Sequence, residues 1–312
     1  MISPADRASL VAFSRDSIAR GSKSFAAASK LFDPETRERA WMLYAWCRAA
    51  DDLADGQEMG HGMKAVADPR TQLEIIRNRT EAALAGQSSG DPAFDALGVV
   101  VAETGMPHRY PRDLIEGFAL DADGFAPANE QDLYRYCYHV AGVVGCMMAI
   151  VMGVRPDDNA TLDRACDLGM AFQLANIARD ITEDHAAGRC YLPLDWLDEM
   201  SIPRAEMDKP RYRAHLAILA ARLSDRASAY EASARYGAKA LPYRSAWAVL
   251  AAAGIYGAIA REVKRRGTMA WDKRVTTSGT GKAMFVISGA AQAAMRSHFR
   301  DQGRAQLWSR VT

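Results

Sequence analysis

The chain is 312 residues long, and 49% of its residues are hydrophobic and 25% are charged. These proportions are typical of a globular protein and exclude a disordered, collagen-like or disulfide-dense chain. The 39 basic and 38 acidic side chains nearly cancel, to a formal charge of +1. This balance argues against capture of nucleic acid by a broad basic surface, so any anion must be held by local chemistry.

Helical periodicity dominates the chain, and no series of alternating strands stands out. In chain order, the pattern predicts helices over 6–20, 34–55, 71–85, 92–103, 111–119, 130–154, 160–186, 212–236 and 243–266, with loops over 56–69, 86–91 and 122–129. The signals are clearest for 34–55, where Asp33 can cap the helix, Pro34 occupies its first position and Gly56 can end it. Because there is no repeat or long linker, we expect a single all-α domain over 1–312.

The apolar runs, the cysteines and the first residues each indicate where in the cell the protein is expected. Two uncharged runs, 140–154 and 246–260, are shorter than the roughly 20 residues of a membrane span, so we expect buried helices there and no transmembrane anchor. Five cysteines without C-x-x-C spacing favour neither a zinc site nor a disulfide framework. The first residues lack the pattern of a secretory signal. The expected location is therefore the cytoplasm.

The helix predicted over 34–55 carries polar and charged side chains on one face. Tyr44, Arg48, Asp51 and Asp55 stand at offsets of 0, 4, 7 and 11 residues, which places them on the same side of a helix. Apolar residues share this side, so part of the charge is turned toward the interior. A buried charge without a partner is costly, so these carboxylates need a counter-charge or a bound cation.

A second face of the same kind lies on the helix predicted over 160–186. Gln173, Asn176, Asp180 and Asp184 stand at offsets of 0, 3, 7 and 11 residues. If the two helices face each other, four carboxylates converge and their repulsion requires cations. Hard oxygen donors select Mg²⁺ or Mn²⁺ over zinc, and magnesium commonly bridges to the phosphates of a substrate. The two faces together therefore indicate a metal-bound diphosphate.

Each of these signals has a simpler interpretation when it is taken alone. A single Asp-Asp-x-x-Asp such as 51–55 is more often a solvated helix face, and a single arginine is more often a surface residue. Two motifs at matching spacing, flanked by arginines, favour the metal site. Candidate contacts for the diphosphate are Ser22, Arg48, Arg179, Arg189 and Arg274, and candidate side chains around a carbocation are Tyr44, Tyr136, Tyr138, Tyr191 and Tyr256.

Four separated regions of the chain resemble the squalene/phytoene synthase family. They are 22–25 (SKSF), 44–55 with its DDLAD, 136–145 (YCYHVAGVVG), and 173–184 (QLANIARDITED) followed by 188–193 (GRCYLP). All four occur in the family's order, and the last one is most similar to bacterial phytoene synthases of carotenoid biosynthesis. The resemblance spans about residues 15–275 and leaves 276–312 weakly assigned.

The resemblance implies the all-α fold of class I terpenoid synthases, a helical bundle with a central cavity. It implies a prenyltransferase that joins two geranylgeranyl diphosphates head to head, through prephytoene diphosphate, to phytoene, releasing diphosphate. Several Mg²⁺ or Mn²⁺ ions would bridge the diphosphate, and no NADPH would be needed. An intact pair of aspartate motifs makes a non-catalytic binding or assembly protein the remotest alternative. A squalene or dehydrosqualene synthase acting on farnesyl diphosphate is the nearer alternative, since motifs alone do not set chain length.

The family motifs also suggest a role for each matching residue. The expected metal ligands are Asp51, Asp55, Asn176, Asp180 and Asp184, and the expected catalytic residues are the four aspartates with Arg48 and Tyr136. The expected substrate contacts are Ser22, Tyr44, Arg48, Gln173, Asn176, Arg179, Arg189, Tyr191, Tyr256 and Arg274. Because substrate tails and product are lipid-soluble, we also expect transient peripheral contact with a membrane, and other carotenoid enzymes are candidate partners. Nucleic acid is not an expected partner.

Overall fold

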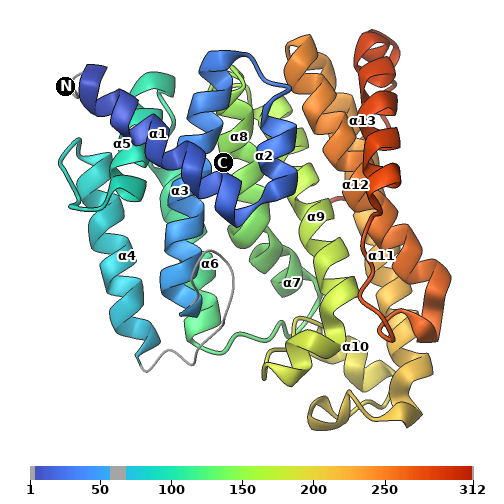
Figure 1. The fold of residues 1–312 in the computed structure, drawn as a ribbon. Coiled ribbons are helices and arrows are strands. Elements are labelled where there is room, and N and C mark those ends of the chain that lie inside the picture. The colour runs from blue at the N-terminus through green and yellow to red at the C-terminus, as the bar shows by residue number, and fades with distance from the viewer. Residues whose placement is uncertain (1–3, 57–67, 311–312) are drawn as a thin grey trace. The chain divides into compact units, whose positions relative to one another are not determined.

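The computed structural model describes residues 4–56 and 68–310, and all regular secondary structure in these ranges is helical (Figure 1). The chain divides into two compact units, which are described separately. The first comprises Met1–Asp123 and Met147–Asp158, and the second comprises Gly124–Cys146 and Asn159–Thr312. A single domain over 1–312 stays a prediction.

The first unit is built around one helix. Its helices are α1 (Pro4–Gly21), α2 (Lys23–Ser29), α3 (Pro34–Asp55), α4 (Pro69–Leu84), α5 (Pro92–Thr104) and α6 (Arg109–Ala122). All the others contact α3, so α3 is central to this unit. Trp46 on α3 is fully buried, and its indole N–H donates to Thr80 Oγ1 of α4 at 3.3 Å. The helix that bears the first aspartate motif is therefore a core element.

Both ends of α3 lie where the sequence predicted them. The Asp33 side chain accepts a hydrogen bond from the Thr36 N–H at 3.0 Å, and Pro34 follows it in the first turn. Gly56 ends the helix at φ 61°, in the left-handed region that glycine enters readily. With both ends fixed, Arg48, Asp51 and Asp55 fall in the last two turns.

The second unit contains the longest helices. Its elements are α7 (Glu130–Cys137), the π-turn η1 (Tyr138–Gly142), the start of α8 (Val143–Val151), α9 (Asn159–Ala186), α10 (Leu194–Glu199), α11 (Arg213–Gly237), α12 (Tyr243–Arg266) and α13 (Gly279–Ala294). Short 3₁₀ turns are η2 (Arg204–Glu206), η3 (Pro210–Tyr212), η4 (Ala238–Ala240), η5 (Gly267–Met269) and η6 (Arg296–His298). Helices α9, α11 and α12 pack against one another, and α13 packs on α12.

The helix expected over 130–154 is interrupted, which corrects that prediction. A π-turn separates α7 from α8, and it lies beside a very close approach to α9: a side chain on Gly169 would put its Cβ 2.1 Å from the Ala141 carbonyl oxygen. Gly169 therefore allows the backbones of η1 and α9 to approach closely. The helix ends at Val151 because Gly153 adopts φ 94°.

Three helices were not predicted, namely α2, α10 and α13. Helices α2 and α10 have only seven and six residues, too few for a periodic pattern. Helix α13 begins Gly279-Thr280-Gly281 and contains Gly289, a composition of low helix propensity. It forms because it packs on α12, where a Cβ on Gly289 would lie 2.9 Å from the Ala251 nitrogen. Apart from its ends, the loop predicted over 56–69 lies outside the described residues.

Helix α12, continued by η5, is the one described helix that is long and apolar enough to cross a membrane. The candidate span is Tyr243–Met269, with a mean hydropathy of 1.3, and 56% of its most apolar window is buried inside the structure. Because α12 packs against α9, α11 and α13, a core position accounts for this composition as well. Helix length and hydropathy alone are weak evidence for a membrane span.

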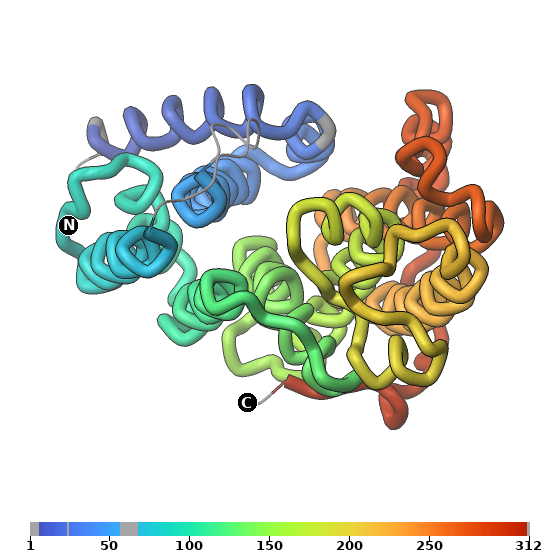
Figure 2. The backbone as a smooth tube through the Cα atoms, turned by 90° about the horizontal axis from the view of Figure 1, so that it is seen from below, coloured from blue at the N-terminus to red at the C-terminus, as the bar shows by residue number. Residues whose placement is uncertain are grey.

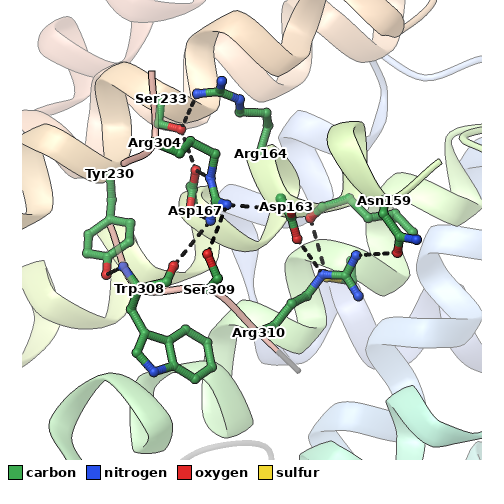
Figure 3. A network of polar contacts seen from close by, with 12 residues as sticks. Asn159, Asp163, Arg164, Asp167, Tyr230, Ser233, Arg304, Trp308, Ser309 and Arg310 are labelled. Atoms are coloured by element: carbon green, nitrogen blue, oxygen red, sulfur yellow. Dashed lines mark hydrogen bonds and ion pairs between the residues drawn. The ribbon is translucent and has the colours of Figure 1, made fainter. Parts of the chain in front are cut away.

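The C-terminal segment, dark red in Figure 2, returns to the first half of α9. It binds α9 through a network of ion pairs (Figure 3). Arg304 donates to both oxygens of Asp167 at 2.8 Å. Arg310 donates to Asp163 and to Asn159, each at 2.8 Å. The network fastens residues 304–310 to α9.

Candidate active site

The first aspartate motif forms a half-site on the last turns of α3. Arg48 donates to Asp51 at 2.6 Å and lies 3.8 Å from Asp52. It also donates to the Tyr44 hydroxyl at 3.4 Å. Burial alone would lower the pKa of Arg48, but Tyr44 and Asp51 raise it above its ordinary value. The guanidinium thus stays charged beside the carboxylates, of which Asp51 is 40% exposed.

The start of α2 adjoins this half-site through Tyr44. A Cβ on Gly21 would lie 2.5 Å from the Tyr44 hydroxyl, and the Phe25 ring meets the Tyr44 ring edge-on at 5.6 Å between centroids. Ser22 lies between Gly21 and Phe25 and caps α2, accepting the Phe25 N–H at 3.2 Å. Gly21 and Phe25, on either side of Ser22, thus lie against Tyr44, and the diphosphate-binding role of Ser22 stays a prediction.

The second aspartate motif forms another half-site, on the last turns of α9. Arg179 donates to Asp180 Oδ1 at 2.7 Å, and Arg274 donates to Asp180 Oδ2 at 2.9 Å. Arg274 also bonds Glu183. Asp180 is only 15% exposed and Arg274 is 46% exposed. The carboxylate is thus turned partly inward, with two guanidinium groups on it.

Arg274 comes from the segment after α12, and one contact of that segment and one of α12 hold them against α9. The Trp271 indole N–H donates to the Ala178 carbonyl oxygen of α9 at 3.3 Å. Tyr256 of α12 stacks on Phe172 of α9 with 4.0 Å between centroids. Burial alone would lower the pKa of Arg179, but Asp180 raises it, and Tyr256 and Asp184 add to the effect. Tyr256 and Asp184 thus belong to the electrostatic surroundings of Arg179.

Two further predicted residues, Arg189 and Tyr191, follow α9 directly. Gly188, at φ 79°, turns the chain so that the Arg189 N–H donates to the Asp184 carbonyl oxygen at 2.8 Å. Tyr191 stacks on Tyr136 of α7 at 4.8 Å between centroids. Phe125 lies on the other side of Tyr136, at 5.4 Å. Tyr136 and Tyr191 are 3% and 7% exposed, so they are core aromatic residues of the second unit.

The predicted residues thus divide between the two units, each of which carries one aspartate motif with its arginines. Ser22, Tyr44, Arg48, Asp51 and Asp55 belong to the first unit, and Tyr136, Gln173, Asn176, Arg179, Asp180, Asp184, Arg189, Tyr191, Tyr256 and Arg274 belong to the second. Convergence of the four aspartates stays a prediction. Sequence reasoning did not predict that Asp52 lies near Arg48, that Glu183 accepts from Arg274 or that Phe172 stacks on Tyr256. Asp52 and Glu183 stand beside motif residues, whereas Phe172 gave no signal because its partner is far away in the chain.

The donors of each half-site fit a magnesium-like ion. Within residues 4–56 and 68–310, no group of three or more His, Cys, Asp or Glu side chains is arranged to hold a metal. Magnesium, however, is usually bound by one or two carboxylates with substrate phosphates and water completing its shell. Asp51 with Asp55, and Asp180 with Asp184, each offer two carboxylates one helical turn apart. The half-buried Asn176 adds an amide oxygen on the same face of α9.

Comparisons with known proteins agree with the sequence motifs. The sequence profile of the squalene/phytoene synthase family matches residues 18–280, close to the span of the resemblance. The chain is 46% identical over 302 residues to a 15-cis-phytoene synthase of Paracoccus sp. (strain N81106 / MBIC 01143), covering 96% of this chain and 98% of that relative. It is 45% identical over 307 residues to a 15-cis-phytoene synthase of Pantoea ananas, covering 97% and 98%.

Solved structures give the same answer for the fold. The crystal structure of a dehydrosqualene synthase in complex with a ligand matches with a TM-score of 0.82 and 26% identity, covering 94% of this chain and 98% of that one. The all-α expectation is therefore confirmed.

Proposed function

The chain belongs to the squalene/phytoene synthase family, and we propose that it catalyses the phytoene synthase reaction. In this reaction two geranylgeranyl diphosphates join head to head, through prephytoene diphosphate, and yield phytoene and diphosphate. The observation that carries the proposal is 45–46% identity to two bacterial 15-cis-phytoene synthases over nearly the whole chain. The fold is that of the class I terpenoid synthases. The protein is a prenyltransferase that uses no reductant.

We assign metal binding to the two aspartate motifs. Asp51 and Asp55 would hold Mg²⁺ or Mn²⁺ from one side of the diphosphate, and Asp180, Asp184 and Asn176 from the other, with Gln173 as a supporting donor. The ions would supply positive charge where negative charge develops as the allylic C–O bond breaks. Two carboxylates in each half-site, within a turn of each other, support this assignment.

The arginines beside the aspartates are the proposed diphosphate ligands of the chain itself. Arg48, Arg179 and Arg274 already lie against the motif carboxylates, and guanidinium groups bind phosphate oxygens in the same forked way. Arg189 and the Ser22 hydroxyl complete the set. These residues orient the substrate and hold the departing diphosphate close to the cation.

The tyrosines are assigned to the hydrocarbon side of the reaction. Tyr44, Tyr136, Tyr191 and Tyr256 would line the chamber for the hydrocarbon chains and exclude the water that would quench the allylic cation. Proton loss ends the reaction, and the released diphosphate is the proposed base. The supporting observation is that each tyrosine stacks with or meets another aromatic ring.

We also propose that the protein is located in the cytoplasm and contacts a membrane transiently. Two C20 tails and a C40 product partition into lipid, so substrate must arrive from a membrane and product must return to one. Handover to the next carotenoid enzyme would follow at the same surface.

One assay tests the proposal. Purified protein is given Mg²⁺ or Mn²⁺ with geranylgeranyl or farnesyl diphosphate, with and without NADPH, and the hydrocarbon is identified. We expect phytoene from the C20 substrate without reductant, and loss of activity in EDTA that either ion restores. A C30 product alone would instead establish a squalene or dehydrosqualene synthase.

A further inference from the structure

Tyr136, which we assign to the chamber for the hydrocarbon chains, is flanked in the sequence by Tyr134 and Tyr138. These two stand four residues apart on α7 and its continuation, where Tyr138 keeps helical backbone angles, so they share one side of the helix. Tyr136 is two residues from each and therefore lies on roughly the opposite side. Tyr134 is 7% exposed and Tyr138 6%. Contacts that hold the two flanking tyrosines thus fix the rotation of α7 and the position of Tyr136.

Trp308 of the C-terminal segment contacts both flanking tyrosines, one directly and the other through Tyr230. Its ring lies against the Tyr138 ring, with 5.5 Å between centroids. Its backbone N–H donates to the Tyr230 hydroxyl at 3.1 Å (Figure 3). Tyr230 is a buried residue of α11, and its ring meets the Tyr134 ring edge-on at 5.7 Å between centroids. Trp308 thus connects the end of the chain to both tyrosines that flank Tyr136.

The local structure of α7 makes such support necessary. The helix has only eight residues and passes into the π-turn η1, and a helix this short is marginal without tertiary contacts. A π-turn within a helix is frequently found at a functional site. Trp308 is itself anchored, because Arg304 and Arg310 bind α9 on either side of it in the sequence, so one anchor remains when the other is removed. The C-terminal segment therefore supports a short, irregular helix from outside.

We propose that Trp308 is a positioning residue, which holds α7 and η1 so that Tyr136 keeps water out of the chamber. This rests on the proposed function, which gives Tyr136 its place beside the hydrocarbon chains. Water that reaches the allylic cation forms a C–O bond to it and loses a proton to solvent, which gives the C20 alcohol instead of phytoene. Loss of Trp308 should therefore raise the share of alcohol among the products. A residue that only stabilised the fold would change the amount of active protein and leave that share unchanged.

Product analysis and amide hydrogen exchange of the full chain test the proposal together. Trp308→Ala removes the ring that packs on Tyr138, and Tyr230→Phe removes the hydroxyl that accepts the Trp308 N–H. We expect either change to raise the ratio of C20 alcohol to phytoene by about two- to tenfold. Amide exchange over residues 130–142 should become faster as well. Trp308→Phe, which keeps a ring for Tyr138, should restore most of the wild-type ratio.

Two controls separate positioning from a general loss of stability. Trp247→Ala removes another half-buried tryptophan of the second unit, whose indole N–H donates to the Val286 carbonyl oxygen of α13. It should destabilise the fold but keep the wild-type alcohol share and the wild-type exchange over residues 130–142. In protein that already carries Tyr136→Leu, Trp308→Ala should add little to the alcohol share, because effects that pass through one residue are not additive.

The outcomes separate this proposal from the enzymatic one. An unchanged alcohol share in both Trp308→Ala and Tyr230→Phe overturns it, as does a full additional effect of Trp308→Ala on the Tyr136→Leu protein. An equal rise in Trp247→Ala overturns it in favour of general loosening. Wild-type protein that makes no phytoene would contradict the proposed reaction. Faster exchange over residues 130–142 in Trp308→Ala, but not in Trp247→Ala, would then still establish that Trp308 holds α7 and η1.

Discussion

Helix α9 carries two pairs of aspartates at the same four-residue spacing. The two pairs have different ion-pair partners. Asp163 and Asp167 in its first half are held by Arg310 and Arg304 of the C-terminal segment. In the second half of α9, Asp180 is paired with Arg179 and Arg274, and Asp184 lies one turn further along the helix. At one end of α9 the aspartates hold the C-terminal segment, and we call Asp163 and Asp167 with Arg310 and Arg304 the clamp. At the other end, Asp180 and Asp184 are candidate metal ligands.

The two aspartates of the clamp differ in burial, and Asp163 is 24% exposed. The Asp167 side chain is 0% exposed and that of Arg304 15%. Burial raises the pKa of the Asp167 carboxyl above its ordinary value, although Arg304 and Ser233 act in the opposite direction. Its oxygens are taken by Arg304 and by the Ser233 hydroxyl. A carboxylate enclosed in this way can fix a segment in place but cannot bind a new ligand without loss of structure.

In the second pair, Asp180 is 15% exposed and its partner Arg179 is 14% exposed. Arg274, which contributes one of the two ion pairs of Asp180, is 46% exposed. An ion pair with one exposed member is worth little to stability, so its arginine can move from carboxylate to phosphate at small cost. The same aspartate spacing thus occurs with differently exposed partners, since Arg304 is 15% exposed and Arg274 is 46% exposed.

The largest expected effect is on turnover, from Asp180→Asn. Asparagine keeps the size of the side chain and an oxygen for Arg274 but removes the charge that binds a cation. We expect kcat/KM for geranylgeranyl diphosphate to fall by about 10³-fold, with a thermal unfolding midpoint within about 2 °C of wild type. Steady-state kinetics measures kcat/KM, and calorimetry measures the unfolding midpoint. Asp225→Asn, at an exposed aspartate paired with Lys264, is the control.

Two results would contradict the assignment of Asp180. Full activity of Asp180→Asn would exclude it as a metal ligand. Unfolding of the variant would show that both pairs on α9 are structural.

The next effect is on stability, from Arg304→Ala. Removing this arginine leaves the buried Asp167 without its main counter-charge, which should cost about 3–5 kcal/mol of unfolding free energy. Because the folded-state pKa of Asp167 is raised, its contribution to stability is lost as pH rises through that pKa. The deficit of the variant should therefore shrink as pH falls from about 7 toward the ordinary Asp value of about 3.9.

Urea unfolding at several pH values measures this deficit, and Arg300→Ala, at an exposed arginine in the same segment, is the control. Activity per folded molecule should change little. A variant as stable as wild type would show that residues 304–310 are not fastened by this pair.

The contrast also shows where sequence reasoning succeeds. Helix α3 was predicted correctly because Asp33, Pro34 and Gly56 are local signals that act within a few residues of the helix ends. The Asp163 and Asp167 pair was missed because its partners lie 137 to 147 residues away, and nothing near the pair in sequence announces them.

Tertiary packing explains the other failures. Helix α13 and the π-turn η1 both depend on close approaches to a neighbouring helix, which overrule weak local propensity. The shared helix faces of the candidate site residues were predictable because those residues recur at helical spacing. The environment of these residues was not, since burial is set by segments distant in the chain.

The smallest effect is expected for Arg274→Ala, and it tests the second pair most directly. The side chain bonds Asp180 and Glu183 from a half-exposed position, so its loss should cost less than about 1 kcal/mol of stability. If the arginine also binds the diphosphate, kcat/KM should fall by about tenfold, or about 1.4 kcal/mol, mainly through KM. Lys273→Ala removes the neighbouring exposed charge as a control, and Arg274→Lys should recover only part of the loss because the fork is gone. Equal effects of Lys273→Ala and Arg274→Ala would reduce Arg274 to a contribution of general charge.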